Sequence, residues 1–202
     1  MLFYEFERRL AANLPTEFLK DVFPRGMRRL AELGLFRGAV QVPTKVGFKM
    51  MADRLDVVKW YVYYFRQIEP QISLAWNRLL SDGDDVIDIG GNVGYYALLA
   101  GQLVGPKGHV VTVEPSKIIF DQLNNNIEIN GFKHITPLKK AVSDTSGVIK
   151  LYYAGDNNQG NTTIMEQNGH TYSEDVDCIT FSEISNYIEL SKVKLIKIDV
   201  EG

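Results

Sequence analysis

Residues 85–100 read DVIDIGGNVGYYALLA, a short apolar run that leads into a cluster of glycines. The run from Val86 to Ile89 has the length and the β-branched composition of a buried strand, and Tyr95 to Leu103 has the apolar pattern of a helix. A strand, a glycine-rich turn and a helix in this order form the context that a nucleotide-binding loop requires. Glycines permit the tight turn and let a ligand approach the main chain closely.

The loop departs from two well-known phosphate-binding patterns. Counted from Gly90, the dinucleotide fingerprint G-x-G-x-x-G requires glycine at the positions of Asn92 and Tyr95. No Gly-Lys-Ser/Thr follows the loop, so the Walker-type pattern is also missing from the sequence. Asparagine tolerates left-handed backbone angles, so Asn92 still allows a tight turn. A nicotinamide-binding oxidoreductase remains an alternative, weakened by the broken fingerprint.

Two acidic residues accompany the loop. Asp88 lies two positions before Gly90, and Glu114 follows the next apolar run, Val110 to Val113. A carboxylate at the end of the second strand is placed to accept hydrogen bonds from both ribose hydroxyls of an adenosine ligand. The charge of Asp88 favours a cationic group, such as an ammonium or a sulfonium, over a pyrophosphate. The pair therefore indicates S-adenosylmethionine; the alternative is that both acids only cap loops.

From Asp85 onward, short apolar runs alternate with helical patterns. A second helix is expected from Ser116 to Asn130, and a third strand from Ile135 to Val142, interrupted by Pro137. This alternation predicts βαβ units, and therefore an α/β fold with a parallel sheet covered by helices. Residues 147–180 predict an antiparallel insertion, after which residues 193–200 resume the parallel sheet.

The part of the chain before the glycine loop divides into two regions. Residues 1–45 predict a helical N-terminal extension, because apolar residues recur at helical spacing, as at Phe3, Phe6 and Leu10. Residues 46–202 form the second predicted domain. Within it, the aromatic run of residues 60–65 fits either a strand or a buried helix, and residues 69–80 have helical spacing.

Composition restricts the function classes. The 202 residues are 45% apolar with a net charge of -3, which argues against a nucleic-acid binder that works by bulk electrostatics. One cysteine, Cys178, excludes an internal disulfide framework and a Cys-based zinc site. No apolar run approaches the ~20 residues of a membrane-spanning helix. The N-terminus lacks the pattern of a secretory signal, so we expect a cytoplasmic protein.

Four segments resemble FkbM-type S-adenosylmethionine-dependent methyltransferases. They are DIGGNVGYYALLA at 88–100, VTVEP at 111–115, the L-x-x-N-x-x-x-N run at Leu123, Asn126 and Asn130, and IKIDVEG at 196–202. The resemblance runs in order from about Gly47 to the last residue. It implies the class I methyltransferase Rossmann-like sheet, S-adenosylmethionine as cofactor, and methylation of a hydroxyl on a sugar or other small molecule.

The resemblance also implies roles for individual residues. The methionine and ribose portions of the cofactor would be bordered by Asp88, Gly90, Asn92 and Gly94, and Gly91 belongs to the same cofactor-binding loop, although family members often have alanine there. Glu114 would bind the ribose, and the adenine would be bordered by Ala141, Val142, Ser143 and Asp144. Asp199 and Glu201 would face the transferred methyl group.

Transfer of a methyl group to an alcohol calls for a base that takes the hydroxyl proton. Asp199 is the first candidate for this base and Glu201 the second. Alternatively, the two carboxylates could coordinate a divalent cation that lowers the pKa of the acceptor hydroxyl. A third interpretation is that Asp199 positions the cofactor while Glu201 caps a turn.

Proteins of this type continue past the Asp-Val-Glu-Gly motif, whereas this sequence ends there, at residue 202. We therefore expect a C-terminally incomplete sheet with residues 193–200 as an exposed edge strand, prone to self-association. A truncated product is favoured over completion of the sheet by another chain. A catalytically inactive cofactor-binding fragment is the alternative to an active enzyme.

Overall fold

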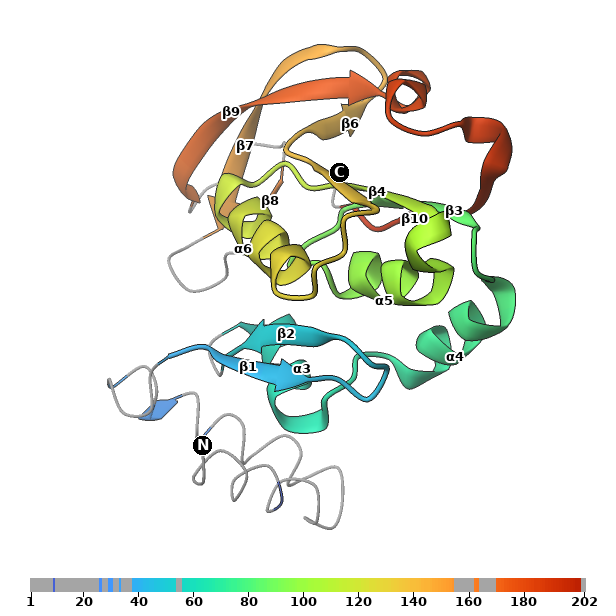
Figure 1. Cartoon of the computed structure of the whole chain (residues 1–202). Coiled ribbons are helices and arrows are strands. Elements are labelled where there is room, and N and C mark those ends of the chain that lie inside the picture. The colour runs from blue at the N-terminus through green and yellow to red at the C-terminus, as the bar shows by residue number, and fades with distance from the viewer. Residues whose placement is uncertain are drawn as a thin grey trace. The chain divides into compact units, whose positions relative to one another are not determined.

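The computed structural model describes residues 9, 26, 29, 30, 33, 38–53, 56–154, 162–163 and 170–200. The chain divides into two compact units, Met1–Pro70 and Gln71–Gly202, and its elements are labelled in Figure 1. Most of the predicted helical extension, residues 1–45, lies outside the described residues. The predicted domain boundary after residue 45 stays a prediction.

The first unit contains a β-hairpin and a helix. Strands β1 (Val40–Pro43) and β2 (Lys49–Ala52) pair antiparallel, so the end of the segment predicted as helical is a strand. The aromatic run that the sequence left open between strand and helix is helical, in α3 (Val57–Phe65). The Asp56 carboxylate accepts the Lys59 N–H at 3.0 Å, and Arg66, with φ of 60°, ends the helix. These two caps set the ends of a short helix. The residues between them favour a strand by local propensity, so propensity alone would not predict this helix.

Helix α4 (Pro70–Leu79), which the helical spacing predicts, lies in the second unit from Gln71 onward. The first sheet of this unit is parallel throughout. The strand order is β10 (Val193–Ile198), β3 (Asp85–Ile89), β4 (His109–Val113) and β5 (Ile135–Leu138). Helix α5 (Tyr95–Val104) connects β3 to β4 through a 3-10 turn (Gly105–Lys107), and α6 (Lys117–Glu128) connects β4 to β5. This arrangement confirms the predicted α/β fold.

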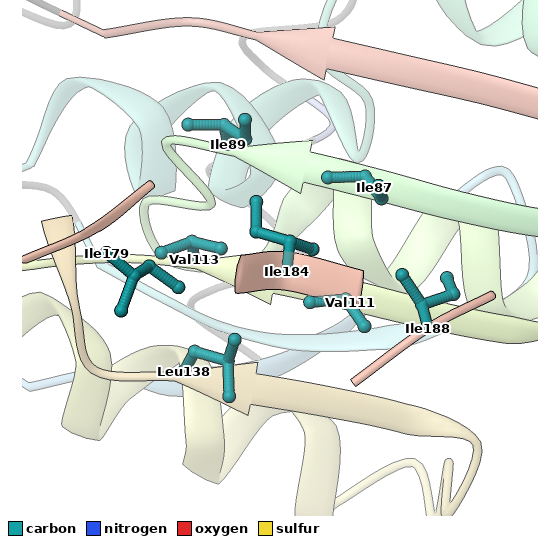
Figure 2. Packing of buried hydrophobic residues seen from close by; sticks show 8 residues of the cluster. All are labelled: Ile87, Ile89, Val111, Val113, Leu138, Ile179, Ile184 and Ile188. Carbon is teal, nitrogen blue, oxygen red and sulfur yellow. The ribbon is translucent and has the colours of Figure 1, made fainter. Parts of the chain in front are cut away.

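The parallel sheet is covered on both faces, as the complete burial of β3 requires. On one face, apolar side chains of β3, β4 and β5 pack against the end of the second sheet and the 3-10 turn Ser182–Asn186 (Figure 2). This cluster comprises Ile87, Ile89, Val111, Val113, Leu138, Ile179, Ile184 and Ile188. Asp88 and Thr112 alternate with these residues and therefore point to the opposite face, toward α6.

The second sheet has the order β6 (Ala141–Ser143), β9 (His170–Thr180), β7 (Gly147–Ala154) and β8 (Thr162–Thr163). The antiparallel pairing of β7 with β9 confirms the predicted insertion. The prediction of one strand from Ile135 to Val142 was wrong: β5 ends at Leu138, and β6 joins the other sheet. The chain changes sheets at residues 139–140, where the Lys140 N–H donates to the Leu138 carbonyl.

Cys178 is a free thiol, 5% exposed, in a small apolar cluster with Leu151, Tyr153 and Val176, where it packs as a small apolar residue. Within the described ranges, no helix is both long enough and apolar enough to cross a bilayer.

Candidate functional site

The loop between β3 and α5 folds over the end of β4. The N–H groups of Gly90 and Gly91 both donate to the Val113 carbonyl, at 2.9 and 3.0 Å. Asn92 has a φ of 48°, the left-handed conformation that its residue type tolerates. Gly94 is the N-cap of α5, so the loop leads directly into the helix. The glycine-rich segment is thus a tight turn at the carboxyl end of the sheet, where ligands bind in open α/β folds.

Gly90 and Gly91 are required by the close approach of neighbouring groups. A Cβ at residue 90 would lie 1.9 Å from the carbonyl oxygen of Asp199, and the Asp199 N–H donates to the Ile89 carbonyl at 3.0 Å. A Cβ at residue 91 would lie 2.2 Å from the Thr112 Oγ1. Thr112 therefore leaves no room for a side chain at residue 91. The first contact brings the loop against the end of β10.

Glu114 lies directly after β4 and is held by the loop and by the start of α6. Its Oε2 accepts the Asn92 N–H at 2.9 Å, and its Oε1 accepts the Ser116 N–H at 3.0 Å. Burial raises the pKa of Glu114 to about 7, although both N–H groups favour the charged form. Each carboxylate oxygen has two lone pairs, so each can accept one more hydrogen bond from a ligand hydroxyl.

Asp88 is fully buried and is paired with a lysine that the sequence analysis missed. Lys197 Nζ lies 3.1 Å from Asp88 Oδ1, and the Thr112 hydroxyl donates to Oδ2 at 3.4 Å. Burial raises the pKa of Asp88, and the positive charge of Lys197 opposes that shift. The signal in the sequence is the lysine within the apolar run of residues 195–198, because a charge among apolar residues of a sheet strand needs a partner where it is shielded from water. Residue 197 lies directly beside residue 88 in the parallel register.

Lys197 connects three parts of the site. Its Nζ donates to the Gly90 carbonyl at 3.3 Å and lies 3.4 Å from Asp199 Oδ2. It also lies 5.2 Å from the centre of the Tyr96 ring, within the range of a cation–π contact. The Lys197 side chain is 15% exposed, whereas that of Asp199 is 76% exposed. The Asp199 carboxylate can therefore meet a molecule that approaches from solvent.

The predicted site residues fall into two groups in the structure. Hydrogen bonds and ion pairs bring together the loop, Asp88, Glu114 and Asp199. The segment predicted to border adenine belongs to the second sheet, through β6, with Asp144 accepting from the Ser143 hydroxyl at 3.1 Å. Glu201 lies outside the described residues.

The part of the chain that the structure describes contains no group of three or more His, Cys, Asp or Glu side chains placed to hold a metal ion. His109 Nε2 lies 2.8 Å from the Thr136 hydroxyl, and His134 Nε2 lies 2.9 Å from the Gly101 carbonyl. Both rings thus serve contacts within the fold.

Comparison with known proteins gives a family match that begins at Asp88. A family model described as the methyltransferase FkbM domain matches residues 88–202. The chain is 34% identical over 59 residues to a protein-L-isoaspartate O-methyltransferase of Ignicoccus hospitalis, covering 29% of this chain and 28% of that protein. The corresponding enzyme of Methanosarcina mazei is 36% identical over 59 residues, which cover 29% of this chain and 24% of that enzyme. The chain thus spans well under half the length of these curated relatives.

Similar solved structures include a protein-L-isoaspartate O-methyltransferase, with 32% identity and a TM-score of 0.33 over 36% of this chain and 23% of that one. A methyltransferase from Aquifex aeolicus, described as S-adenosylmethionine-dependent, has 25% identity and a TM-score of 0.32 over 36% of this chain and 38% of that one.

Proposed function

Because the chain belongs to the FkbM methyltransferase family, we propose that it transfers a methyl group from S-adenosylmethionine to a hydroxyl of a sugar or other small metabolite. The observation that carries this proposal is the position of Glu114. Glu114 is a buried carboxylate directly after β4 and is held by the loop after β3, a position that supports a role in binding the ribose of an adenosine ligand. Its two oxygens match the two hydroxyl donors of a ribose.

The charges around Gly90 support a cationic ligand. Asp88 and Asp199 carry two negative charges when ionised, and Lys197 carries one positive charge, at 3.1 and 3.4 Å from them. The excess of negative charge attracts the sulfonium and ammonium groups of S-adenosylmethionine and repels a pyrophosphate. Lys197 already lies against the Asp88 carboxylate. A ligand that contacts Asp88 directly therefore has to bind a carboxylate that also holds Lys197.

Bound S-adenosylmethionine supplies a methyl group attached to a positively charged sulfur. This sulfur is a good leaving group when the methyl group is transferred. The chain's own residues then have two tasks, to hold the acceptor oxygen in line and to receive its proton. Asp199 is the proposed proton acceptor, because it is exposed at the end of β10 beside the loop. Glu201 stays the second candidate, and the Ala141–Asp144 segment stays the proposed border of the adenine.

The test is a calorimetric titration of the chain with S-adenosylhomocysteine, with NAD as the control ligand. We expect binding of S-adenosylhomocysteine alone. Glu114→Ala should weaken it by ~1–3 kcal/mol, since the ribose hydroxyls lose a charged acceptor. Glu128→Ala is the matched control, because Glu128 is an exposed acid on α6 whose carboxylate accepts from the Asn124 side chain. Equal affinity in wild type and a folded Glu114→Ala variant would contradict the ribose assignment.

Turnover is tested separately, by transfer of labelled methyl from S-adenosylmethionine to a panel of sugars and small hydroxyl compounds. Asp199→Asn should retain binding of S-adenosylhomocysteine and lose transfer. Binding without transfer to any hydroxyl acceptor would favour the alternative, a catalytically inactive cofactor-binding chain. Binding of NAD in preference to S-adenosylhomocysteine would refute both.

A further inference from the structure

The hairpin formed by β7 and β9 contacts two segments that the proposed function assigns to the adenosine half of the cofactor. We propose that Tyr153 of β7 and Glu174 of β9 are positioning residues, which fix the Glu114–Ser116 turn and thereby the affinity for adenosine. This inference rests on the proposed function, because the turn matters for binding only if Glu114 holds the ribose.

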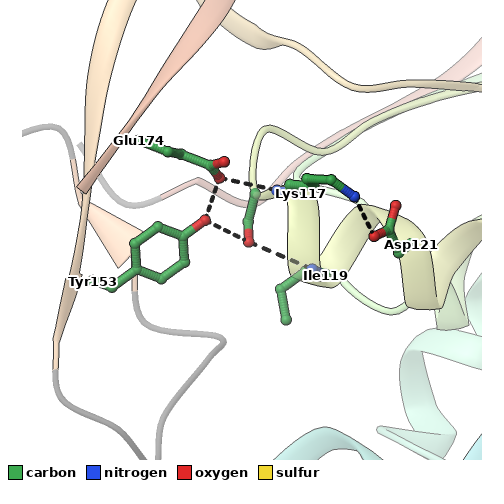
Figure 3. A network of polar contacts seen from close by, with 6 residues as sticks. Lys117, Ile119, Asp121, Tyr153 and Glu174 are labelled. Atoms are coloured by element: carbon green, nitrogen blue, oxygen red, sulfur yellow. Dashed lines mark hydrogen bonds and ion pairs between the residues drawn. The ribbon is translucent and has the colours of Figure 1, made fainter. Parts of the chain in front are cut away.

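The first contact is a polar network at the start of α6, shown in Figure 3. Tyr153 Oη lies 2.9 Å from Ser116 Oγ and also bonds to the Glu174 carboxylate. The same carboxylate oxygen accepts the Lys117 N–H at 3.0 Å. Tyr153 is 5% exposed and Ser116 is fully buried, so the bond between these two residues forms where water competes little.

The protons of this network can be assigned by chemistry. The Tyr153 hydroxyl is the donor to both Ser116 Oγ and the Glu174 carboxylate, so its single proton is shared between the two acceptors. Ser116 Oγ also accepts the Ile119 N–H at 3.4 Å, as the N-cap of α6. Every polar group in the network then has a partner, which makes its geometry well defined.

One further hydrogen bond connects this network to Glu114, the residue proposed to bind the ribose. The Ser116 N–H donates to Glu114 Oε1, so a residue held by Tyr153 in turn orients the carboxylate. Glu174 also lies at the positive end of α6, where the helix dipole stabilises a negative charge. The hairpin therefore holds the Glu114–Ser116 turn through Ser116, whereas the loop after β3 holds it through Glu114.

The second contact comes from the same strand. Cys178, Ile179 and Thr180 of β9 pair with Ala141, Val142 and Ser143, the segment proposed to border the adenine. Glu174 and Cys178 are four residues apart on one strand, a span of ~13 Å at 3.3 Å per residue. One strand thus connects the ribose side and the adenine side, and its apolar residues pack in a shared cluster with Ala141 and Tyr153.

The experiment compares four single variants for their affinity toward S-adenosylhomocysteine and toward adenosine, at a temperature where each is folded by circular dichroism. Tyr153→Phe and Glu174→Ala each remove two hydrogen bonds of this network. Because these bonds act on the ligand only through the turn, each variant should weaken both ligands by about 3- to 10-fold. Glu174→Gln should bind nearly as wild type, because its amide oxygen still accepts from Lys117 and Tyr153.

Asp175→Ala is the matched control. Asp175 is the next acid on β9, is 70% exposed, and lies 3.9 Å from Lys150, so its removal should leave both affinities unchanged. Because Tyr153 and Glu174 contact each other, the double variant Tyr153→Phe/Glu174→Ala should lose less than the product of the two single losses.

The outcomes separate the two proposals. Wild-type protein that binds neither ligand would refute the proposed function, and this inference with it. Wild-type binding with unchanged affinity in folded Tyr153→Phe and Glu174→Ala, even at a lower melting temperature, would leave the function intact and overturn the inference. An equal loss in Asp175→Ala would also overturn it, because the general charge of the hairpin would then govern binding.

Discussion

Glu114 combines deep burial with two backbone hydrogen bonds, and the balance of these effects determines when it carries a charge. Burial prevails and raises the pKa of Glu114 from 4.5 to about 7. Between these values the folded state holds a proton that the unfolded state has lost, so the slope of stability with pH is negative there. Stability from this group is complete below pH 4.5 and is lost as the pH rises through about 7.

We therefore predict that wild-type protein loses unfolding free energy between pH 4.5 and about 7, relative to Glu114→Gln, which has no charge to bury. The pKa shift corresponds to a difference on the order of 3 kcal/mol. Urea unfolding of both proteins across this range measures it, and the difference between the two curves removes other titrating groups. Parallel curves would mean that Glu114 keeps an ordinary pKa in the folded state.

Lys197 shows what residue-level analysis of the sequence could and could not find. The acids Asp88 and Glu114 were visible because each follows or interrupts an apolar run beside the glycine loop. The lysine was equally visible in its strand, but its partner lies 109 positions earlier in the sequence, and only the strand order of the sheet brings the two together. Pairing between distant segments is the information that local patterns lack.

At the scale of elements, α3 depends on its first capping residue. Asp56→Ala should destabilise the protein by ~1 kcal/mol, because the Lys59 N–H loses the acceptor that now lies 3.0 Å away. Asp56→Ser retains a side-chain oxygen at the cap and serves as the control. Urea unfolding followed by circular dichroism measures both variants; equal stability of wild type and Asp56→Ala would show that tertiary packing alone maintains the helix.

The elements after Asp85 were largely predictable, since strand and helix patterns alternate there with clear turn residues between them. The exception is the segment from Ile135 to Val142, where composition is strand-like on both sides of residues 139–140. Pro137 is compatible with β5, because β5 is an edge strand of this sheet and proline has no N–H to donate to a further strand. Nothing in the local pattern shows that Ala141 starts a strand of another sheet, since its partner Cys178 is far along the chain.

At the scale of the whole molecule, β10 presents an apolar edge. It has β3 as its one neighbour in the described sheet, and Ile196, Ile198 and Val200 are 45 to 65% exposed. An exposed apolar edge strand is a template for association with another chain. The edge strand that the sequence predicted is therefore present in the part of the sheet that the structure describes.

We predict that the protein self-associates as its concentration rises, and that Ile198→Lys reduces this association by placing a charge beside the free edge. Val148→Lys is the control, because Val148 is equally exposed, at 66%, but lies on β7 in the other sheet. Sedimentation velocity over a wide concentration range measures both. A wild-type monomer throughout that range would contradict the prediction.

The pairing of Asp88 with Lys197 also has a consequence for the order of assembly during synthesis. Lys197 follows Gly90 by 107 residues, so β3, β4 and β5 leave the ribosome long before their lysine does. A carboxylate buried without its counter-charge costs several kcal/mol, so any partly folded state with β3, β4 and β5 in place but without β10 would keep Asp88 hydrated or protonated. Pairing of β10 with β3 supplies Lys197 to Asp88 and brings Asp199 against the glycine loop. The site is therefore complete only when the last described strand to be synthesised has joined the sheet.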